Sequence, residues 1–193
     1  MQIRELHPGD IEPLKCLLVR AFEGDPAFRF MVSDSAAWVR FAGRYFELAL
    51  RSAHHQGLAF TDRLRRGVAL WESPGTRASL LGQFWQFCRL AHIYGNNFGN
   101  ALAIQRVTRK YRPRRDHWYL SCLATDPGHR GRGVADALLA PMLALASQQQ
   151  LPVFLDCLNR DNVPFYLSRG FSLVDEVTLA NGLKVWPMIR EPG

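Results

Sequence analysis

A predicted buried strand, a loop of glycine and arginine, and a predicted helix follow one another between residues 118 and 149. Residues 118–124 are almost all aromatic or aliphatic, as is typical of a buried strand. The turn sequence Asp126-Pro127-Gly128 ends this strand. Beyond the loop, one apolar stripe at helical spacing predicts a helix: Val134, Leu138, Met142 and Leu145. This order of elements constrains the fold more than any other feature, and it indicates an α/β protein.

The loop has the chemistry of an anion-binding site. The first amides of a helix have no partner within the helix and carry the positive end of its dipole. Gly131 and Gly133 lack a β-carbon, so an anion can approach the backbone there, and Arg130 and Arg132 add positive charge. We hypothesise a phosphate or pyrophosphate site. The alternative is a basic strand-to-helix connection that binds no ligand.

Two familiar phosphate-binding loops do not match this segment. A P-loop requires glycine followed by lysine, and no such pair occurs in the chain. The dinucleotide fingerprint requires a third glycine where this chain has Asp136. Neither a P-loop nucleotide site nor a dinucleotide site is therefore predicted.

Two motifs resemble signatures of the GNAT N-acetyltransferase family. Residues 130–135, Arg-Gly-Arg-Gly-Val-Ala, match its acyl-CoA pyrophosphate loop, Arg/Gln-x-x-Gly-x-Gly/Ala. Residues 159–171 resemble its second signature, Asn followed after six residues by Tyr and then, after three more, by Gly-Phe. Both occur in the family's order with a helix and a strand between them. The resemblance extends from His117 to Phe171.

The resemblance implies a fold and a cofactor. The fold would be a single α/β domain over residues 1–193, with a mixed sheet of six to seven strands, two splayed parallel strands and flanking helices. The activity would be transfer of an acetyl group from acetyl-CoA to an amine, and the alternative is a non-catalytic acyl-CoA sensor or scaffold. The resemblance assigns cofactor contacts to the strand end, the loop and the second motif: Leu123, Ala124, Thr125, Arg130, Gly131, Arg132, Gly133, Val134, Ala135, Asn159 and Asn162.

Tyr166 has the position of the family's general acid, and a phenol can donate a proton at neutral pH. It could instead be an interfacial tyrosine packed between Phe165 and Phe171. The general base stays open: Glu72 at a strand end is the first candidate, His117 is the second, and each could instead be structural. A backbone amide of residues 123–125 is the candidate donor to the developing oxyanion.

The acceptor is expected to be a small-molecule or peptide amine. By resemblance, the segment after the first helix lines its pocket, which makes candidates of Asp25, Phe28, Phe30 and Met31, with plain packing as the alternative. The densest basic run comprises Arg106, Arg109, Lys110, Arg112, Arg114 and Arg115. This run could be a solvated helix end, a contact to the CoA 3′-phosphate or a nucleic-acid surface, and nucleic acid ranks last because little aromatic character accompanies the charge.

Composition indicates one soluble globular domain. The 193 residues carry a formal charge of +7, nearly all of it from arginine, which could attract a polyanionic cofactor or reflect compositional bias. No apolar run reaches the length of a membrane span, and the N-terminus does not resemble a signal peptide, so we expect a cytoplasmic monomer or homodimer. No metal is expected, and buried free thiols are expected for Cys16, Cys88, Cys122 and Cys157.

The pattern of apolar and turn residues predicts strands over 1–6, 57–63, 68–72, 118–124 and 152–158. Helices are predicted over 10–22, from 33 or 35 to 53, 80–94, 101–110, 133–149 and 161–168. Pro141 should kink its helix near Ala137. An Asn-Gly turn predicts a final hairpin from strands over 171–179 and 183–189.

Overall fold

The computed structural model describes residues 1–32, 34–75, 98–179 and 182–193. These residues form a mixed sheet of eight strands in the order β1-β2-β3-β4-β5-β8-β6, and β7 pairs with β8 off this path. Among the described strands, β4 and β5 are the parallel neighbours and the other pairs are antiparallel. The strands are β1 (Ile3–Glu5), β2 (Ala59–Asp62), β3 (Gly67–Glu72), β4 (Trp118–Thr125), β5 (Val153–Cys157), β6 (Ser172–Leu173), β7 (Val177–Thr178) and β8 (Lys184–Arg190).

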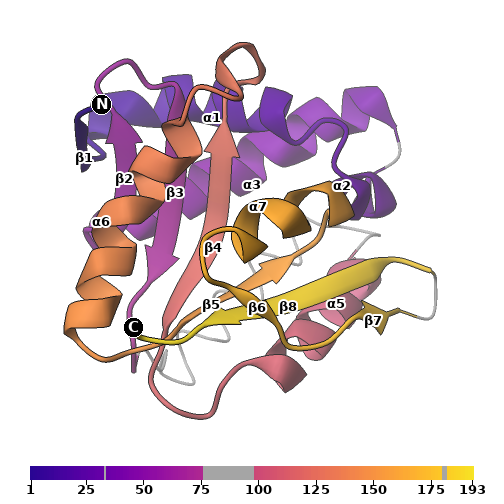
Figure 1. The fold of residues 1–193 in the computed structure, drawn as a ribbon. Coiled ribbons are helices and arrows are strands. Elements are labelled where there is room, and N and C mark those ends of the chain that lie inside the picture. Colours follow the sequence, from indigo (N-terminus) through magenta and orange to yellow (C-terminus); the bar gives the residue numbers. More distant parts are fainter. Residues whose placement is uncertain (33, 76–97, 180–181) are drawn as a thin grey trace.

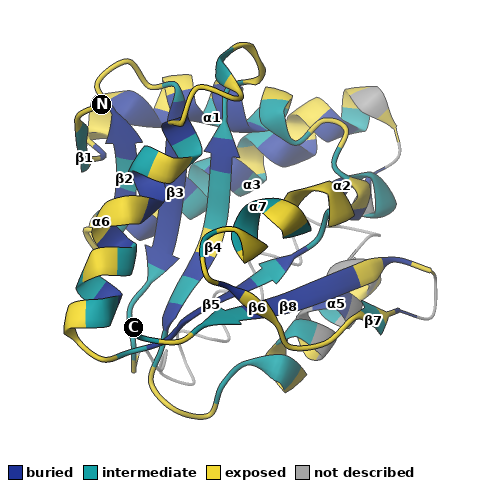
Figure 2. Ribbon diagram, in the orientation of Figure 1, coloured by how far each residue is buried: buried dark blue, intermediate teal, exposed yellow. Residues whose placement is uncertain are grey.

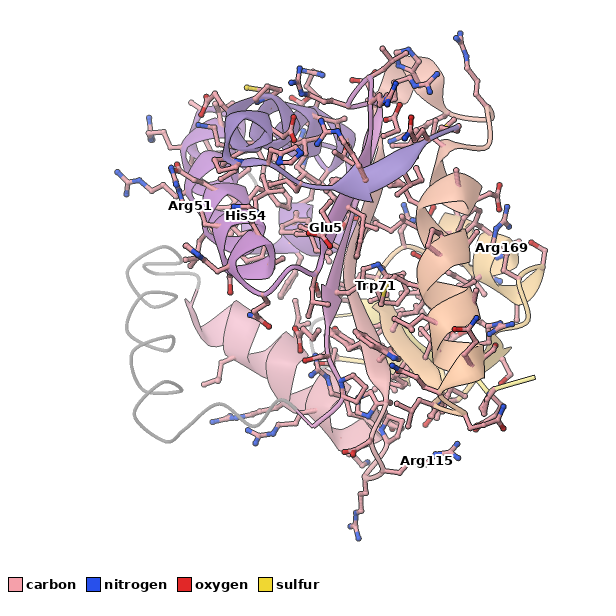
Figure 3. The ribbon with its side chains drawn as sticks, turned by 90° about the vertical axis from the view of Figure 1, so that its left-hand side faces the viewer. Glu5, Arg51, His54, Trp71, Arg115 and Arg169 are labelled. Carbon is pink, nitrogen blue, oxygen red and sulfur yellow. The ribbon has the colours of Figure 1, made fainter. Side chains whose placement is uncertain are left out.

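Helices cover both faces of the sheet (Figure 1). The sheet is seen close to edge-on in Figure 3, with α1, α3 and α5 on one side and α6 and α7 on the other. The first group comprises α1 (Ile11–Ala21), α3 (Ser35–His55) and α5 (Phe98–Tyr111), and the short helix α2 (Pro26–Met31) contacts α5. The second comprises α6 (Val134–Gln148) and α7 (Val163–Leu167). The predicted α/β class with a mixed sheet and flanking helices is confirmed.

Two apolar cores result from the alternation of side chains along the strands. On β3, Val68 and Leu70 pack against α1 and α3, whereas Ala69 and Trp71 pack on the side of α6. Trp71 lies between the sheet and α6 in Figure 3, and Figure 2 shows β3 buried along most of its length. Each such large apolar side chain contributes about 1.5–3 kcal/mol through burial.

Gly67 sets how closely α6 can approach the sheet. A β-carbon at this position would lie 2.8 Å from both the Ala124 carbonyl oxygen and Val134 Cγ1. Contacts that short do not occur in real proteins, so any side chain here would force α6 away from the sheet. The absence of a side chain at Gly67 therefore positions the N-terminus of α6 beside the end of β4.

The two parallel strands separate soon after they begin. β4 and β5 pair only at Trp118 with Val153 and at Tyr119 with Phe154. From there β4 continues against β3 alone and β5 against β8 alone, so the two strands diverge in Figure 1. We call the space between residues 120–125 and residues 155–157 the β4–β5 gap. The splayed parallel pair implied by the family resemblance is thus confirmed.

Two expectations for the ends of the chain need correction. No helix is predicted between the helix over 10–22 and the one that begins at 33 or 35, yet Pro26 begins the short helix α2, whose first turn is capped by the Asp25 carboxylate. The strand predicted over 171–179 is interrupted and forms β6 and β7. Pro187 of β8 accepts from the Val174 N–H but has no N–H to return, so the ladder stops there.

Three other expectations fare differently. The helix predicted over 161–168 begins later, at Val163, after a 3₁₀ turn. Pro141 lies inside α6, and the kink near Ala137 stays a prediction. The helix predicted over 80–94 lies outside the described residues.

The cysteines differ in exposure. Cys157 is buried and Cys122 is half-buried, but Cys16 is exposed, so the expectation of a buried thiol is wrong for Cys16 because its side chain falls on the outer face of α1. Cys88 lies outside the described residues.

Over the described ranges, no helix is long and apolar enough to cross a bilayer. Nor does this part of the chain contain a cluster of three or more potential metal ligands.

Candidate active site

The loop between β4 and α6 has a shape that only glycine permits. Gly131 and Gly133 have φ angles of 72° and 73°, in the left-handed region that L side chains rarely adopt. A β-carbon at either position would meet nothing within 4 Å, so the surface of the loop is open to a ligand. Gly133 is the N-cap of α6 and makes no side-chain cap, so the first amides of this 15-residue helix are left for another acceptor.

Contacts from α1 and the β2–β3 turn hold this loop. Asp126 accepts hydrogen bonds from the Gly128 N–H at 2.9 Å and from Arg20 Nη2 at 2.7 Å. The Asp126 N–H in turn donates to the Arg66 carbonyl oxygen at 2.8 Å. Arg130 Nη2 lies 3.3 Å from the Ala21 carbonyl oxygen at the end of α1. The loop is therefore fixed to the rest of the molecule before any ligand binds.

The predicted cofactor strand has one paired edge and one open edge. Leu123, Ala124 and Thr125 pair with Ala69, Val68 and Gly67 of β3. On their other side no described strand lies beside them. Their backbone groups therefore have no strand partner in the described part of the chain only on the edge that faces β5.

The other predicted cofactor residues divide between core and surface. Val134, the first residue of α6, has its side chain buried against the sheet, so only its backbone can face a ligand, and Arg132 is exposed on the loop. Asn159 Oδ1 accepts from the Asp161 N–H at 3.0 Å, so this side chain caps the turn before α7. Asn162 is exposed at the start of α7 and makes no cap. Ala135 is half-buried in the first turn of α6.

A link between α6 and α7 neutralises Asp136. Arg169 forms an ion pair with Asp136 and stacks on the Phe165 ring at 3.6 Å. Figure 3 shows Arg169 on the side of the sheet that carries α6 and α7. An unpaired carboxylate near the loop would repel an anion, and this ion pair reduces that repulsion.

Tyr166 of α7 reaches the β4–β5 gap. Its ring packs edge-to-face with Phe165 at 5.2 Å and Phe171 at 5.6 Å. Burial raises the pKa of its hydroxyl, and the neighbouring thiols of Cys157 on β5 and Cys122 on β4 raise it further. Within the described residues the hydroxyl has no hydrogen-bond partner. Tyr166 thus fits both expectations: its hydroxyl is protonated and can donate in the gap, and its ring packs in the interface with Phe165 and Phe171.

Four side chains from distant parts of the chain meet on the other face of the gap. Glu72 at the end of β3 forms an ion pair with Arg112 Nη1 at 3.4 Å. The Arg112 guanidinium stacks on the Tyr119 ring at 3.6 Å. The Tyr119 hydroxyl donates to Asp156 Oδ2 at 3.0 Å. We call Glu72, Arg112, Tyr119 and Asp156 the gap cluster.

Asp156 is the member that the sequence reasoning missed. Burial raises the pKa of its carboxyl group to about 6; Tyr119 and Arg112 oppose this shift and Glu72 adds to it. Its Oδ1 atom is buried and has no partner among the described residues. An aspartate inside the apolar strand Val153–Cys157 is the one sequence signal that could have singled it out.

The two proposed bases differ in their relation to this cluster. Glu72 belongs to it, whereas His117 stands at its border, immediately before β4. The His117 ring packs edge-to-face on Phe154 at 6.0 Å, and its Nδ1 lies 2.8 Å from the Arg115 carbonyl oxygen. Arg115 itself points away from the molecule in Figure 3 and pairs with Glu191.

The predicted acceptor residues on α2 are also divided. Phe28 is buried among the rings of Phe22, Trp38, Tyr45 and Phe46, so packing explains it. Asp25 is different, because burial raises the pKa of its carboxyl group and it lies close enough to raise the pKa of the Cys122 thiol. Phe30 packs partly buried against the same core, and the Met31 side chain lies outside the described part.

Comparison with known proteins agrees with this geometry. Residues 104–192 match the acetyltransferase (GNAT) domain model. An uncharacterised N-acetyltransferase of Schizosaccharomyces pombe is 24% identical over 207 residues, covering 100% of this chain and 84% of that protein.

Solved structures of acetyltransferases share the fold. The histone acetyltransferase HPA2 and related acetyltransferase of Corynebacterium glutamicum superposes with a TM-score of 0.74 at 23% identity, covering 100% of this chain and 96% of that one. Arylalkylamine N-acetyltransferase 2 of Aedes aegypti gives 0.73 at 13% identity, covering 100% and 99%. The polyamine N-acetyltransferase of Drosophila melanogaster gives 0.66 at 16% identity, covering 98% and 99%. Residues 104–192 of this chain thus match the GNAT acetyltransferase domain, and the chain has the fold of solved acetyltransferases.

Proposed function

We propose that this protein is an N-acetyltransferase that transfers an acetyl group directly from acetyl-CoA to the amine of a small molecule, and that the transfer takes place in the β4–β5 gap. The observation that carries this proposal is the position of the Tyr166 hydroxyl, a protonated group with no hydrogen-bond partner among the described residues, in a gap whose β4 side leads to the glycine loop. The family implies the acyl donor. The direct transfer and the residues that perform it are our inference.

The residues present fit an acyl-CoA. The loop offers open backbone at Gly131 and Gly133, and Arg130 and Arg132 supply charge for a pyrophosphate. The open edge of Leu123, Ala124 and Thr125 suits an extended amide-bearing arm, which would add to β4 as a strand does. The uncapped start of α6 supports the same assignment.

The chain's own groups would divide the chemistry. Bound acetyl-CoA supplies an acetyl group activated as a thioester. A backbone N–H of residues 123–125 stabilises the charge that develops on the carbonyl oxygen. Tyr166 donates its proton to the departing sulfur, and its raised pKa keeps it protonated at neutral pH.

Two features favour a small cationic acceptor. Carboxylates stand on three elements around the gap, at Asp25, Glu72 and Asp156, and their field attracts an ammonium group. Two proteins of the same fold are named for arylalkylamine and polyamine substrates. A small primary amine is therefore the proposed class of acceptor.

Calorimetric titration with acetyl-CoA tests the cofactor site. We expect binding by the unaltered protein and at least tenfold weaker binding by Gly133→Glu, which places both a charge and a strained backbone in the loop. Gly43→Glu on α3 is the matched control, since its β-carbon also meets open space, and it should bind normally. Equal binding by all three proteins would contradict the assignment of the loop.

Release of free CoA thiol tests the transfer itself. The unaltered protein is assayed with an arylalkylamine, a polyamine and a lysine-containing peptide as acceptors. Turnover with the small amines and little with the peptide is expected. Binding of acetyl-CoA without turnover on any amine would support the sensor alternative and overturn the proposal.

A further inference from the structure

We propose that Asp156 is the general base of the transfer and that Tyr119 and Arg112 position it. This inference rests on the proposed function and deepens it, because it assigns the general base to a residue other than the two candidates from the sequence, Glu72 and His117. It begins from a difference between the two carboxylate oxygens of Asp156: Oδ2 is hydrogen-bonded, and Oδ1 has no partner among the described residues.

The free oxygen is the first step. Oδ2 accepts a hydrogen bond from the Tyr119 hydroxyl at 3.0 Å, and the buried Oδ1 has no donor in the described part of the chain. A buried acceptor without a partner is destabilising, so such atoms are rare unless a ligand or water satisfies them. An amine nitrogen carries the N–H donors that Oδ1 lacks.

The position in the sheet is the second step. Asp156 lies two residues beyond Phe154, the last residue of β5 that pairs with β4, and so borders the gap where it opens. Its neighbours Leu155 and Cys157 pack in the core under α6, so Asp156 points to the face that carries α5. Tyr166 belongs to the core under α6. Acid and base thus approach the gap from opposite faces of the sheet.

The surrounding charges are the third step. Asp156 faces Tyr119 from β4, Arg112 from the segment after α5, and Glu72 from β3. Its register neighbour on β8 is the uncharged Pro187. The opposing effects leave its pKa at about 6, so the carboxylate is mostly ionised at pH 7 yet basic enough to take a proton. Arg112 is itself held by Glu72, which limits its pull on Asp156.

The proton balance of the step is complete. As the amine nitrogen bonds to the carbonyl carbon and the carbon–sulfur bond breaks, Asp156 Oδ1 accepts the proton that nitrogen loses. The Tyr166 hydroxyl gives its proton to sulfur. The Asp156 carboxyl group then releases its proton to water and Tyr166 takes one back, which restores both groups.

Asp156→Asn is the decisive variant because asparagine keeps the shape and cannot accept the proton. With an amine that the unaltered protein acetylates, we expect kcat to fall at least 100-fold, within the usual range for loss of a general base, and the KM for acetyl-CoA to stay within threefold. Asp175→Asn is the matched control, since it removes an exposed aspartate of the β6–β7 connection, and it should leave kinetics unchanged.

The pH profile separates a base from a structural residue. In the unaltered protein, protonation of Asp156 should lower kcat/KM by a further factor of about ten for each pH unit below about pH 6. This acidic limb should be absent from the profile of Asp156→Asn, in which kcat/KM should depend on pH only through ionisation of the amine substrate. Tyr119→Phe should keep the limb but shift it to higher pH, because the lost hydrogen bond no longer favours the charged carboxylate.

The free protein gives a readout that needs no turnover. The thermal midpoint of the unaltered protein should fall relative to that of Asp156→Asn as pH rises from 4 to 7, and Asp175→Asn should show no such trend. Full activity of Asp156→Asn, or loss of the limb in Glu72→Gln and not in Asp156→Asn, would overturn the assignment. Absence of turnover in the unaltered protein would instead overturn the proposed function.

Discussion

Asp10 and Asp156 both have carboxyl groups that are largely removed from solvent, but they differ in hydrogen bonding and in the direction of their pKa shifts. Asp10 is 1% exposed and accepts four hydrogen bonds: two from Arg4, one from Arg65 and one from the His7 N–H. Asp156 accepts one, from Tyr119, and its Oδ1 has no partner among the described residues. The arginines hold the pKa of Asp10 well below its usual range, whereas burial raises that of Asp156 to about 6.

This difference separates a group that stabilises the fold from one that is held ready for chemistry. A carboxylate saturated with donors gains from being charged and has nothing left to bind. Asp10 joins β1, the start of α1 and the β2–β3 turn in this way. A carboxylate with a free buried oxygen destabilises the charged folded state, and such cost is tolerated where function needs it.

Replacing Asp10 by Asn should have the largest effect on stability. The change leaves Arg4 and Arg65 without their counter-charge, and we expect the free energy of unfolding to fall by about 3 kcal/mol. Urea denaturation at pH 7 measures it. Activity per folded molecule should be unchanged, since Asp10 lies outside the gap. A decrease in the free energy of unfolding below about 1 kcal/mol would contradict a structural role for the ion pairs of Asp10 with Arg4 and Arg65.

Replacing Asp156 by Asn should change stability with a pH dependence of the opposite sign. The folded pKa of Asp156 is raised, so the folded state binds more protons than the unfolded state between pH 4 and 6, and its stability falls as pH rises through that window. The unaltered protein should lose at most about 3 kcal/mol relative to Asp156→Asn between pH 4 and pH 8. The lowered pKa of Asp10 acts in the other direction, since its stabilisation is present above pH 4 and is lost on acidification.

Replacing Tyr166 by Phe should have a smaller effect, and on rate alone. We expect kcat to fall about 30-fold, equivalent to about 2 kcal/mol, with unchanged affinity for acetyl-CoA. Stability should stay within about 0.5 kcal/mol or rise, because the described structure shows no hydrogen bond of this hydroxyl that the change would remove. A matching loss of stability and rate would show that Tyr166 belongs with Asp10 as a structural group.

Local sequence patterns predicted the elements that build the cofactor loop. The strand over 118–124, the helix over 133–149 and the strand over 152–158 agree with β4, α6 and β5 to within one or two residues at each end. Turn chemistry and apolar periodicity act within one element, so they are visible in the chain itself. The opening of the β4–β5 gap came from the family resemblance and not from these patterns.

The gap cluster could not be predicted because its members are far apart in sequence. Glu72, Arg112, Tyr119 and Asp156 come from four segments, and only the folded sheet brings them together. Arg112 lies in a basic run whose role the sequence leaves open, and of that run it alone stacks on a ring at the gap in the described structure. The interruption at Val174 is similar, since it depends on Pro187 in a different strand.

A carboxyl-carbon NMR titration of the free protein from pH 3 to 9 tests the contrast between the two aspartates most directly. Resonances are assigned with Asp10→Asn and Asp156→Asn. The signal of Asp156 should shift with a midpoint near pH 6, and that of Asp10 should stay in its ionised position down to the lowest pH at which the protein is folded. An Asp156 signal that titrates near pH 4 would contradict its assignment as the general base.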